Sequence, residues 1–234
     1  MKNKFTGLVF FITAFVLITS CQSKMEKLYS HAKKLSKSEK PEDWEKAIKE
    51  YDKIIAMKIN AREYQALLYR KLGKYSMQFE HWNDALKYYK KALEILPNDG
   101  VLHCKLGVCY SQLSRSQIDK KKKMELVQKA VDEYKLATQL TPDYADSYFG
   151  LGIIYFYVYK DYSQGIKYMA KVLKIDPRSI DAHFALGRFY YEIGELNKAL
   201  EFYKALLSLV PEDDPRYKKV KENISKIYNQ MQNY

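Results

Sequence analysis

The sequence contains few of the residues that build tight turns, metal sites and disulfides. Its 234 residues include only 9 Gly, 6 Pro, 3 Cys and 4 His. So little Gly and Pro excludes a β-sandwich, which needs many tight turns. The histidines are dispersed and lack the spacing of metal ligands, so we expect no metal and no cofactor. With 47% hydrophobic residues, the chain can still bury a core.

Catalytic motifs are also missing. The sequence has no Gly-rich phosphate loop, no nucleophile elbow and no acidic pair with an accompanying base. We therefore expect that the chain is not an enzyme. Cys104 and Cys109 are five residues apart, which on a helix would place them well apart around the axis. They predict small core residues rather than a disulfide, and we expect a buried structural role for His183.

The charge of the chain is one-sided. Lysine and arginine number 40 against 28 acidic residues, which gives a formal net charge of +12. Two interpretations stay open. The lysines could form an ordinary solvated helical surface, or they could favour anionic lipid or acidic partners.

The first 21 residues predict export. Lys2 and Lys4 precede an apolar run from Phe5 to Ile18. A run of this length is typical of a signal peptide, whereas a membrane-spanning helix needs about 20 residues. The run ends in Ile-Thr-Ser-Cys at residues 18–21, which resembles a bacterial lipobox.

The lipobox resemblance implies cleavage before Cys21 and acylation of its thiol and new amino group. More than one acyl chain would hold the protein stably on a membrane. An uncleaved anchor and an ordinary signal peptide with a chance Cys are the alternatives. Gln22 stands where enteric bacteria use Asp for inner-membrane retention, so we expect the periplasmic face of the outer membrane. An exported protein rarely meets nucleic acid, so we expect no nucleic-acid partner.

The rest of the chain is repetitive. "FALGRFYYEIGELNKALEFYKALLSLVP" aligns with the preceding "YFGLGIIYFYVYKDYSQGIKYMAKVLKIDP" and with the earlier "YRKLGKYSMQFEHWNDALKYYKKALEILP". Pro142, Pro177 and Pro211 are 35 and 34 residues apart, and Pro97 holds the same place one repeat earlier. This period and pattern resemble the tetratricopeptide repeat, a helix–turn–helix unit. The resemblance implies an all-α, right-handed superhelical solenoid with a C-terminal capping helix.

Small and large residues recur at fixed places in the repeats. The small residues would let paired helices approach closely, and the large ones would fill the space between neighbouring repeats. Each Pro would end a second helix. Much of the excess of 22 Tyr lies at these packing positions, so most tyrosines are expected to be structural. The small positions are Gly73, Gly107, Gly152 and Gly187, then Ala85, Ala130, Gly165 and Ala199; the large ones are Tyr89, Tyr134, Met169 and Tyr203.

The pattern predicts a complete division of the chain. We expect a signal peptide (1–20), a lipidated Cys with tether (21–25), a divergent repeat (26–60), four further repeats (61–98, 99–143, 144–177 and 178–211) and a capping helix (212–234). The divergent repeat lacks Leu-Gly and has Ile59 at its Pro position. In the repeat of 99–143, Gly107 and Ala130 are 23 residues apart, against 12 for Gly73 and Ala85, so we expect both of its helices to be longer.

The lengthened repeat has a basic tip. The tip would carry Lys120, Lys121, Lys122 and Lys123. It could be a solvated loop without a role, or a basic prong that contacts anionic lipid or a partner protein.

The resemblance also implies a concave groove lined by the first helix of each repeat. Its N-terminal part would show Leu67, Arg70, Lys74, Cys104, Val108 and Ser111. For its aromatic C-terminal part, the expected partner-binding residues are Phe149, Ile153, Phe156, Tyr157, Phe184, Arg188 and Tyr191. Alternatively, these aromatic residues pack on one another or on the capping helix. Lys105, Gly150 and Ala185 stand where the family often has Asn, so we expect no carboxylate clamp.

These features predict a lipid-anchored scaffold or adaptor that binds a partner protein at the bacterial cell envelope. A different function stays open. The chain could be an accessory lipoprotein for periplasmic solute uptake, with a small apolar ligand in a pore lined by Phe149, Phe156, Tyr157 and Tyr191.

Overall fold

The structure is a computed structural model that describes residues 23–35, 37–38 and 41–232. The predicted signal peptide and Cys21 lie outside the described residues. Within these ranges all regular structure is helical and there is no strand. None of the described helices is both long and apolar enough to cross a membrane. The chain divides after Gln65 into two compact units.

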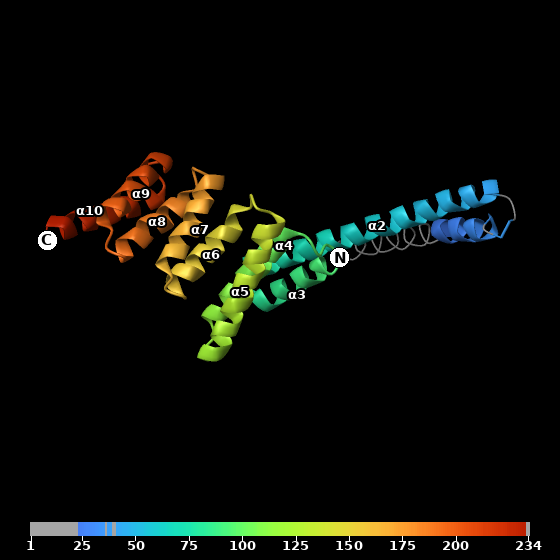
Figure 1. The fold of residues 1–234 in the computed structure, drawn as a ribbon, viewed down its shortest axis with the longest axis horizontal. Helices are drawn as coiled ribbons and strands as arrows, with labels where there is room; N and C mark the ends of the chain where they lie inside the picture. Colours follow the sequence, from blue (N-terminus) through green and yellow to red (C-terminus); the bar gives the residue numbers. More distant parts are fainter. Residues whose placement is uncertain (1–22, 36, 39–40, 233–234) are drawn as a thin grey trace, which may run out of the picture. The chain divides into compact units, whose positions relative to one another are not determined.

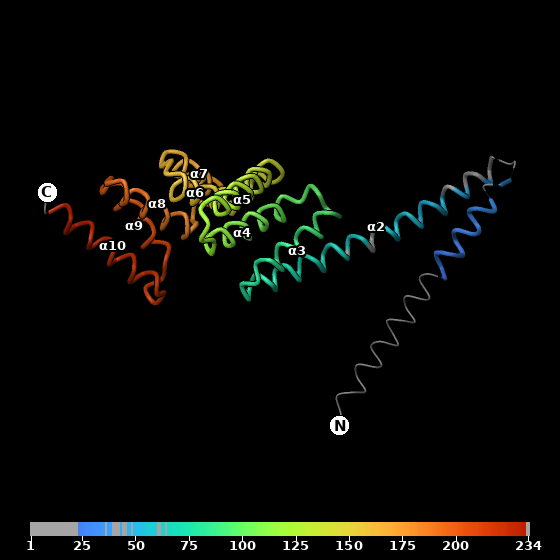
Figure 2. The backbone as a smooth tube through the Cα atoms, turned by 90° about the horizontal axis from the view of Figure 1, so that it is seen from below, coloured from blue at the N-terminus to red at the C-terminus, as the bar shows by residue number. Residues whose placement is uncertain are grey.

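The first unit is a helical hairpin. A helix over residues 23–35 lies antiparallel to the start of α2 (Pro41–Gln78), as Figures 1 and 2 show. His31 Nδ1 lies 2.6 Å from Glu50 Oε1, and the rings of Tyr29 and Tyr51 meet edge to face at 6.1 Å. Ala32, Ala47 and Ile54 are buried in these helices.

The predicted boundary between the repeats of 26–60 and 61–98 does not coincide with a helix end. One helix of 38 residues continues through the expected boundary between the divergent repeat and the next. The reason is local, because Ile59 replaces the Pro that ends the other second helices, and the following "NAREYQALL" contains no Gly or Pro.

The second unit is a stack of helical hairpins. Each of the hairpins α4–α5, α6–α7 and α8–α9 packs its two helices together, and neighbouring hairpins pack on one another. Helix α10 packs on α9 and covers the last hairpin (Figure 1). This arrangement confirms the predicted all-α solenoid with a C-terminal capping helix. The helices after α2 are α3 (Trp82–Leu93), α4 (Gly100–Arg115), α5 (Lys120–Leu140), α6 (Ala145–Tyr157), α7 (Tyr162–Ile175), α8 (Ile180–Glu192), α9 (Leu196–Leu209) and α10 (Pro215–Gln232).

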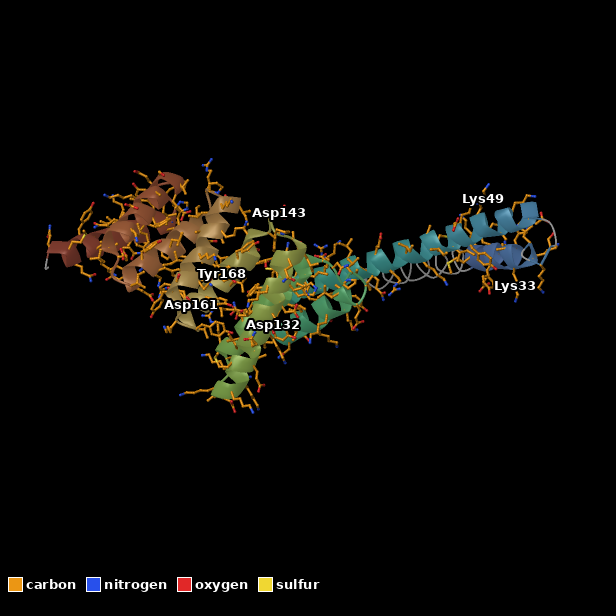
Figure 3. All side chains as sticks on the ribbon, viewed as in Figure 1. Lys33, Lys49, Asp132, Asp143, Asp161 and Tyr168 are labelled. Atoms are coloured by element: carbon orange, nitrogen blue, oxygen red, sulfur yellow. The ribbon has the colours of Figure 1, made fainter. Side chains whose placement is uncertain are left out.

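Local sequence sets the helix ends. Asp161, which Figure 3 labels, precedes α7. Its carboxylate accepts a hydrogen bond from the Gln164 backbone N–H at 3.0 Å. Such N-caps satisfy donors that have no partner inside the helix. Asp99, Asp119 and Ser179 act in the same way before α4, α5 and α8. At the other end, α5, α7 and α9 each stop two residues before a Pro.

The recurring glycines let tyrosine rings pack against helix backbones. A Cβ added at Gly107 would lie 2.7 Å from the Tyr134 ring, and one added at Gly187 would lie 2.8 Å from the Tyr203 ring. Tyr134 also faces the next repeat, where a Cβ at Gly150 would come within 2.4 Å of the same ring. These large residues are therefore structural, and Tyr134 packs on two repeats at once.

The buried side chains of the second unit form three successive clusters. The first extends from α3 to α6, the second from α6 to α8, and the third from α9 to α10. Helix α6 supplies Ile154 to the first cluster and Phe156 to the second. Buried surface is therefore shared between neighbouring hairpins.

The hairpin of α4 and α5 is longer than its neighbours. Compared with α2 and α3, it has three more residues after the first small position, seven more before the second and one more in the loop. In Figure 1 the start of α5, in yellow-green, extends beyond α3 and α7.

Candidate functional site

Phe156 lies in the core, so its expected role as a partner-binding residue on the groove is wrong. The side chain is 0% exposed, and its ring stacks on Phe189 with centroids 3.8 Å apart. The cause is Gly165 on α7, where an added Cβ would lie 2.7 Å from the Cβ of Phe156. Without that Cβ, α6 and α7 approach closely and the phenyl ring fills the space between α6 and α8. A pore lined by this ring does not form.

The aromatic residues around Phe156 are largely packed as well. Tyr157 meets Phe189 edge to face at 5.5 Å, and its hydroxyl donates to Glu192 at 3.2 Å. Arg188 lies 5.3 Å from the centre of the Tyr157 ring and donates from Nε to Glu192 at 2.9 Å. Burial raises the pKa of Tyr157, so the hydroxyl keeps its proton and remains a donor. Tyr157, Arg188 and Glu192 therefore form a polar cluster in which the three side chains contact one another.

The other expected residues of the C-terminal groove differ in exposure. Phe149 and Ile153 are half-buried against the second cluster, and Phe184 packs edge to face on Tyr203 at 5.9 Å. Arg188 is exposed, and so is Tyr191 at 38%. Most of the aromatic rings expected in the C-terminal groove therefore pack on one another, which was the alternative to partner binding. Contact with a partner stays a prediction for the residues that remain accessible.

A cavity of about 370 Å³ lies beside Arg188 and Tyr191. Three of its lining side chains come from α10, which sequence reasoning treated only as a cap. Their spacing of four and three residues places them on one helix face, and this spacing could have indicated from the sequence that they line a common surface. The lining residues are Phe184, Arg188, Tyr191, Glu192, Tyr203, Lys219, Asn223 and Lys226.

A larger cavity of about 640 Å³ lies between the end of α2, α3 and α4. Leu67, Arg70 and Lys74 line it, at the places that the repeat pattern predicts. Cys104, expected beside them, is buried instead. We call this cavity the basic groove, and its lining residues are Leu67, Arg70, Lys71, Lys74, Met77, Gln78, Tyr89, Val101, Leu102 and Lys105.

The basic groove is positively charged along its length. Four cationic side chains line it, and no acidic side chain is among its described lining residues. Arg70 Nη1 lies 3.4 Å from Asp99 Oδ2, and Lys105 Nζ lies 3.4 Å from Asp146 Oδ2, which are long contacts for ion pairs. Lys71 and Lys74 form no ion pair within the described ranges.

Lys105 remains charged in spite of its partial burial. Burial alone would lower the pKa of this ammonium group. A hydrogen bond with Tyr144 and the charge of Asp146 outweigh the burial and raise the pKa. The groove therefore combines fixed positive charge with apolar side chains such as Leu67 and Val101.

The buried cysteines and histidine have structural roles. Cys104 and Cys109 are free and buried, and burial raises their pKa values to about 11 and about 12. Both therefore stay as neutral thiols. His183 is buried, and its Nδ1 donates to the Ser179 carbonyl at 2.9 Å. In the described part of the chain, no group of three His, Cys, Asp or Glu side chains could hold a metal ion.

Comparison with known proteins identifies the repeats. Residues 159–224 match the family model of the tetratricopeptide repeat. A "TPR repeat-containing protein" of Borreliella burgdorferi is 23% identical over 193 residues, which are 82% of this chain and 81% of that protein. The bovine BBSome complex member BBS4 is 25% identical over 171 residues. That match covers 64% of this chain, which spans only 31% of the bovine protein.

The fold is also similar to solved structures of tetratricopeptide repeat proteins. The crystal structure of a thermophilic tetratricopeptide repeat protein of Thermus thermophilus superposes with a TM-score of 0.59 at 16% identity. The superposition covers 87% of this chain and 98% of that one. The sequence period, the stacked hairpins and the family match over residues 159–224 agree, so the second unit has the fold of a tetratricopeptide repeat solenoid and residues 159–224 belong to that repeat family.

Proposed function

We propose that this protein is a lipid-anchored scaffold at the bacterial cell envelope that binds an acidic segment of a partner protein in the basic groove. Its tetratricopeptide fold supports a scaffold for protein–protein interaction in general. Three finer points belong to the proposal: the groove used, the chemistry of the partner and the membrane anchor.

The observation that carries the proposal is the charge of the basic groove. Two of its four cations, Lys71 and Lys74, have no acidic partner among the described side chains, and the contacts that Arg70 and Lys105 make with carboxylates are long, at 3.4 Å. An acidic segment would supply the missing anions, and its apolar residues could pack on Leu67 and Val101. Charge complementarity of this kind sets specificity and speeds association.

The envelope anchor rests on the sequence alone. Acylation at Cys21 would confine the scaffold to a membrane surface, and so raise its effective concentration near envelope partners. Incorporation of labelled palmitate into the wild type, but not into Cys21→Ser, is the expected result. Equal labelling of both proteins would remove the anchor from the proposal and leave the groove untouched.

The groove is tested by crosslinking in intact membranes followed by purification. The wild type is compared with Lys71→Glu/Lys74→Glu, and with Lys87→Glu/Lys218→Glu, which makes the same charge change on α3 and α10. We expect the first variant to lose a specific protein that the wild type and the control variant both retain. An unchanged set of crosslinked proteins in the groove variant would contradict the proposal.

The C-terminal cavity provides the competing location. Arg188→Glu/Tyr191→Ala changes two of its exposed lining side chains, both on α8. Loss of the crosslinked protein in this variant alone would move the docking site to α8 and α10.

A further inference from the structure

We propose that the tip of the α4–α5 hairpin docks onto the surface of a membrane that contains anionic phospholipid. The tip consists of residues 115–124, which are the end of α4, the connecting loop and the first residues of α5. This surface is separate from the basic groove, so it could function whether or not that groove binds a protein.

The tip reaches beyond the hairpins beside it. Helix α5 has ten residues before Ala130, whereas α7 has three before the equivalent Gly165. Seven more residues lengthen a helix by about 10 Å. Figure 1 shows the start of α5 past both α3 and α7. The tip can therefore touch a flat surface that its neighbours within the second unit do not reach.

The tip presents an apolar side chain directly to solvent. Ile118 is 98% exposed, which is the highest value among the large hydrophobic residues described. Met124, in the second turn of α5, is 43% exposed. Since Ile118 contributes nothing to the core, fold stability does not explain an isoleucine at this position. Inserting it among lipid headgroups and upper acyl chains would remove it from water.

Cationic residues flank the exposed isoleucine in the sequence. Arg115 and Lys120–Lys123 supply five positive charges, against two negative charges from Asp119 and Glu125, so residues 115–125 have a local charge of +3. The Asp119 carboxylate is occupied, because it accepts the Lys122 backbone N–H at 3.0 Å. None of the lysines from Lys120 to Lys123 forms an ion pair within the described residues.

The position of these lysines on α5 is unfavourable in water. The first turn of α5 is entirely basic and has no acidic residue. A helix N-terminus carries partial positive charge, so cations there repel it and anions are stabilised. The Asp119 carboxylate at the N-cap offsets part of that repulsion, and phosphate groups gathered around this end of α5 would offset more of it. The unfavourable charge pattern thus becomes favourable at an anionic surface.

The shape of the tip favours a bilayer over a protein or a nucleic acid. A nucleic acid would use the lysines but would leave Ile118 in water. A folded protein would need a recess to enclose a convex tip. The interfacial layer of a bilayer can instead yield around an inserted side chain while its phosphates meet the surrounding lysines.

The contribution of the lysines can be estimated. Each Lys near an anionic membrane contributes about 1 kcal/mol, which corresponds to about a 5-fold change in affinity. Changing Lys120, Lys121 and Lys122 to Gln should therefore weaken binding by on the order of 100-fold. Because the attraction is electrostatic, it should weaken as the ionic strength rises and the screening length falls to about 10 Å at 0.1 M salt.

The test places a reporter on the tip itself. The full chain carries Ile118→Cys in a Cys21→Ser background and is labelled with nitrobenzoxadiazole. Cys104 and Cys109 are buried, so the label goes to position 118. We expect a blue shift in emission with vesicles of equal parts phosphatidylcholine and phosphatidylglycerol, and none with phosphatidylcholine alone. The reporter is local, so binding through the apolar N-terminal run does not imitate the shift.

A matched variant separates the tip from overall charge. Lys87, Lys167 and Lys218 lie on α3, α7 and α10, and changing all three to Gln removes the same charge. We expect this control to keep the wild-type vesicle affinity while the tip variant loses it. Unchanged emission with anionic vesicles would overturn the proposal, and so would equal losses in both variants. A shift that appears with an oligonucleotide but not with vesicles would replace lipid by nucleic acid and also overturn it.

Discussion

Replacing Gly107 by Ala should destabilise the protein, although Ala normally favours a helix. Ala instead of Gly inside a helix gains about 1 kcal/mol in propensity. At Gly107, however, the new Cβ would lie 2.7 Å from two ring carbons of Tyr134, and that ring is 4% exposed. The ring cannot easily retreat, because Gly150 of the next repeat closes its other side. Overpacking of this kind costs about 1–3 kcal/mol, so we expect a net loss of about 1 kcal/mol.

A double-mutant cycle measures this clash directly. Urea unfolding is followed by circular dichroism for the wild type, Gly107→Ala, Tyr134→Leu and the double variant. Leu lacks the ring atoms that clash, so Gly107→Ala should cost at least about 1 kcal/mol less in the Tyr134→Leu background. Gly194→Ala is the control, because Gly194 has a φ of +83° and no atom within 4 Å of an added Cβ. The change in unfolding free energy caused by Gly194→Ala should be the same in the wild-type and Tyr134→Leu backgrounds. A stabilising Gly107→Ala would refute the packing described here.

Three further predictions concern the core. Phe156→Ala should cost about 3–5 kcal/mol in unfolding free energy, as for a buried ring, whereas Tyr191→Ala should cost under about 0.5 kcal/mol; similar melting temperatures for the two variants would contradict the burial of Phe156. Burial raises the pKa values of Tyr89 and Tyr203 from 10.0 to about 12, so the unfolded chain loses these protons first. The contribution of these two tyrosines to the free energy of unfolding should be fully present below pH 10 and should be lost as the pH rises toward 12. The measurement is phenolate absorbance of the folded protein, and absorbance that already reaches its full value at pH 10 would contradict the raised pKa values. The two cysteines of α4 should resist thiol reagents in the folded protein and react only in denaturant, so rapid modification without denaturant would contradict their burial.

The sequence predicted the hairpins because their physical causes are local. Pro142 and Pro177 end helices, and the glycines at Gly107 and Gly187 mark where tyrosine rings pack. These effects depend on one residue and its near neighbours, so a 34-residue period is enough to locate them. The sequence also shows Ile59 where the other repeats have Pro. Because no Pro ends the helix there, α2 continues through this position.

The depth of Phe156 could not be read from periodicity. Phe156 and Tyr191 each stand four residues after the recurring Gly of their own helix, yet one is fully buried and the other is exposed. The difference comes from the partner helix, where Gly165 of α7 lacks the Cβ that Ala199 of α9 has. A helical pattern indicates which face a residue occupies. It does not indicate how closely the neighbouring helix approaches that face.

The basic groove was predicted only in part for a related reason. Leu67, Arg70 and Lys74 come from one helix and were found by alignment, whereas Lys105 joins them from α4 through packing. The α10 residues of the C-terminal cavity were missed because a capping helix was expected only to cover apolar surface.

The sharing of buried clusters between neighbouring hairpins has a consequence for cooperativity. Because α6 contributes to two clusters, no single hairpin of the second unit holds a complete core of its own. Stability then resides mainly in the contacts between neighbours, as in a linear array of coupled units. Opening should begin at an end, where a hairpin has only one neighbour, and amide protection should rise from α10 toward the middle of the stack. Tyr134, held between two repeats, acts as one of the couplings through which the folding of one hairpin depends on the next.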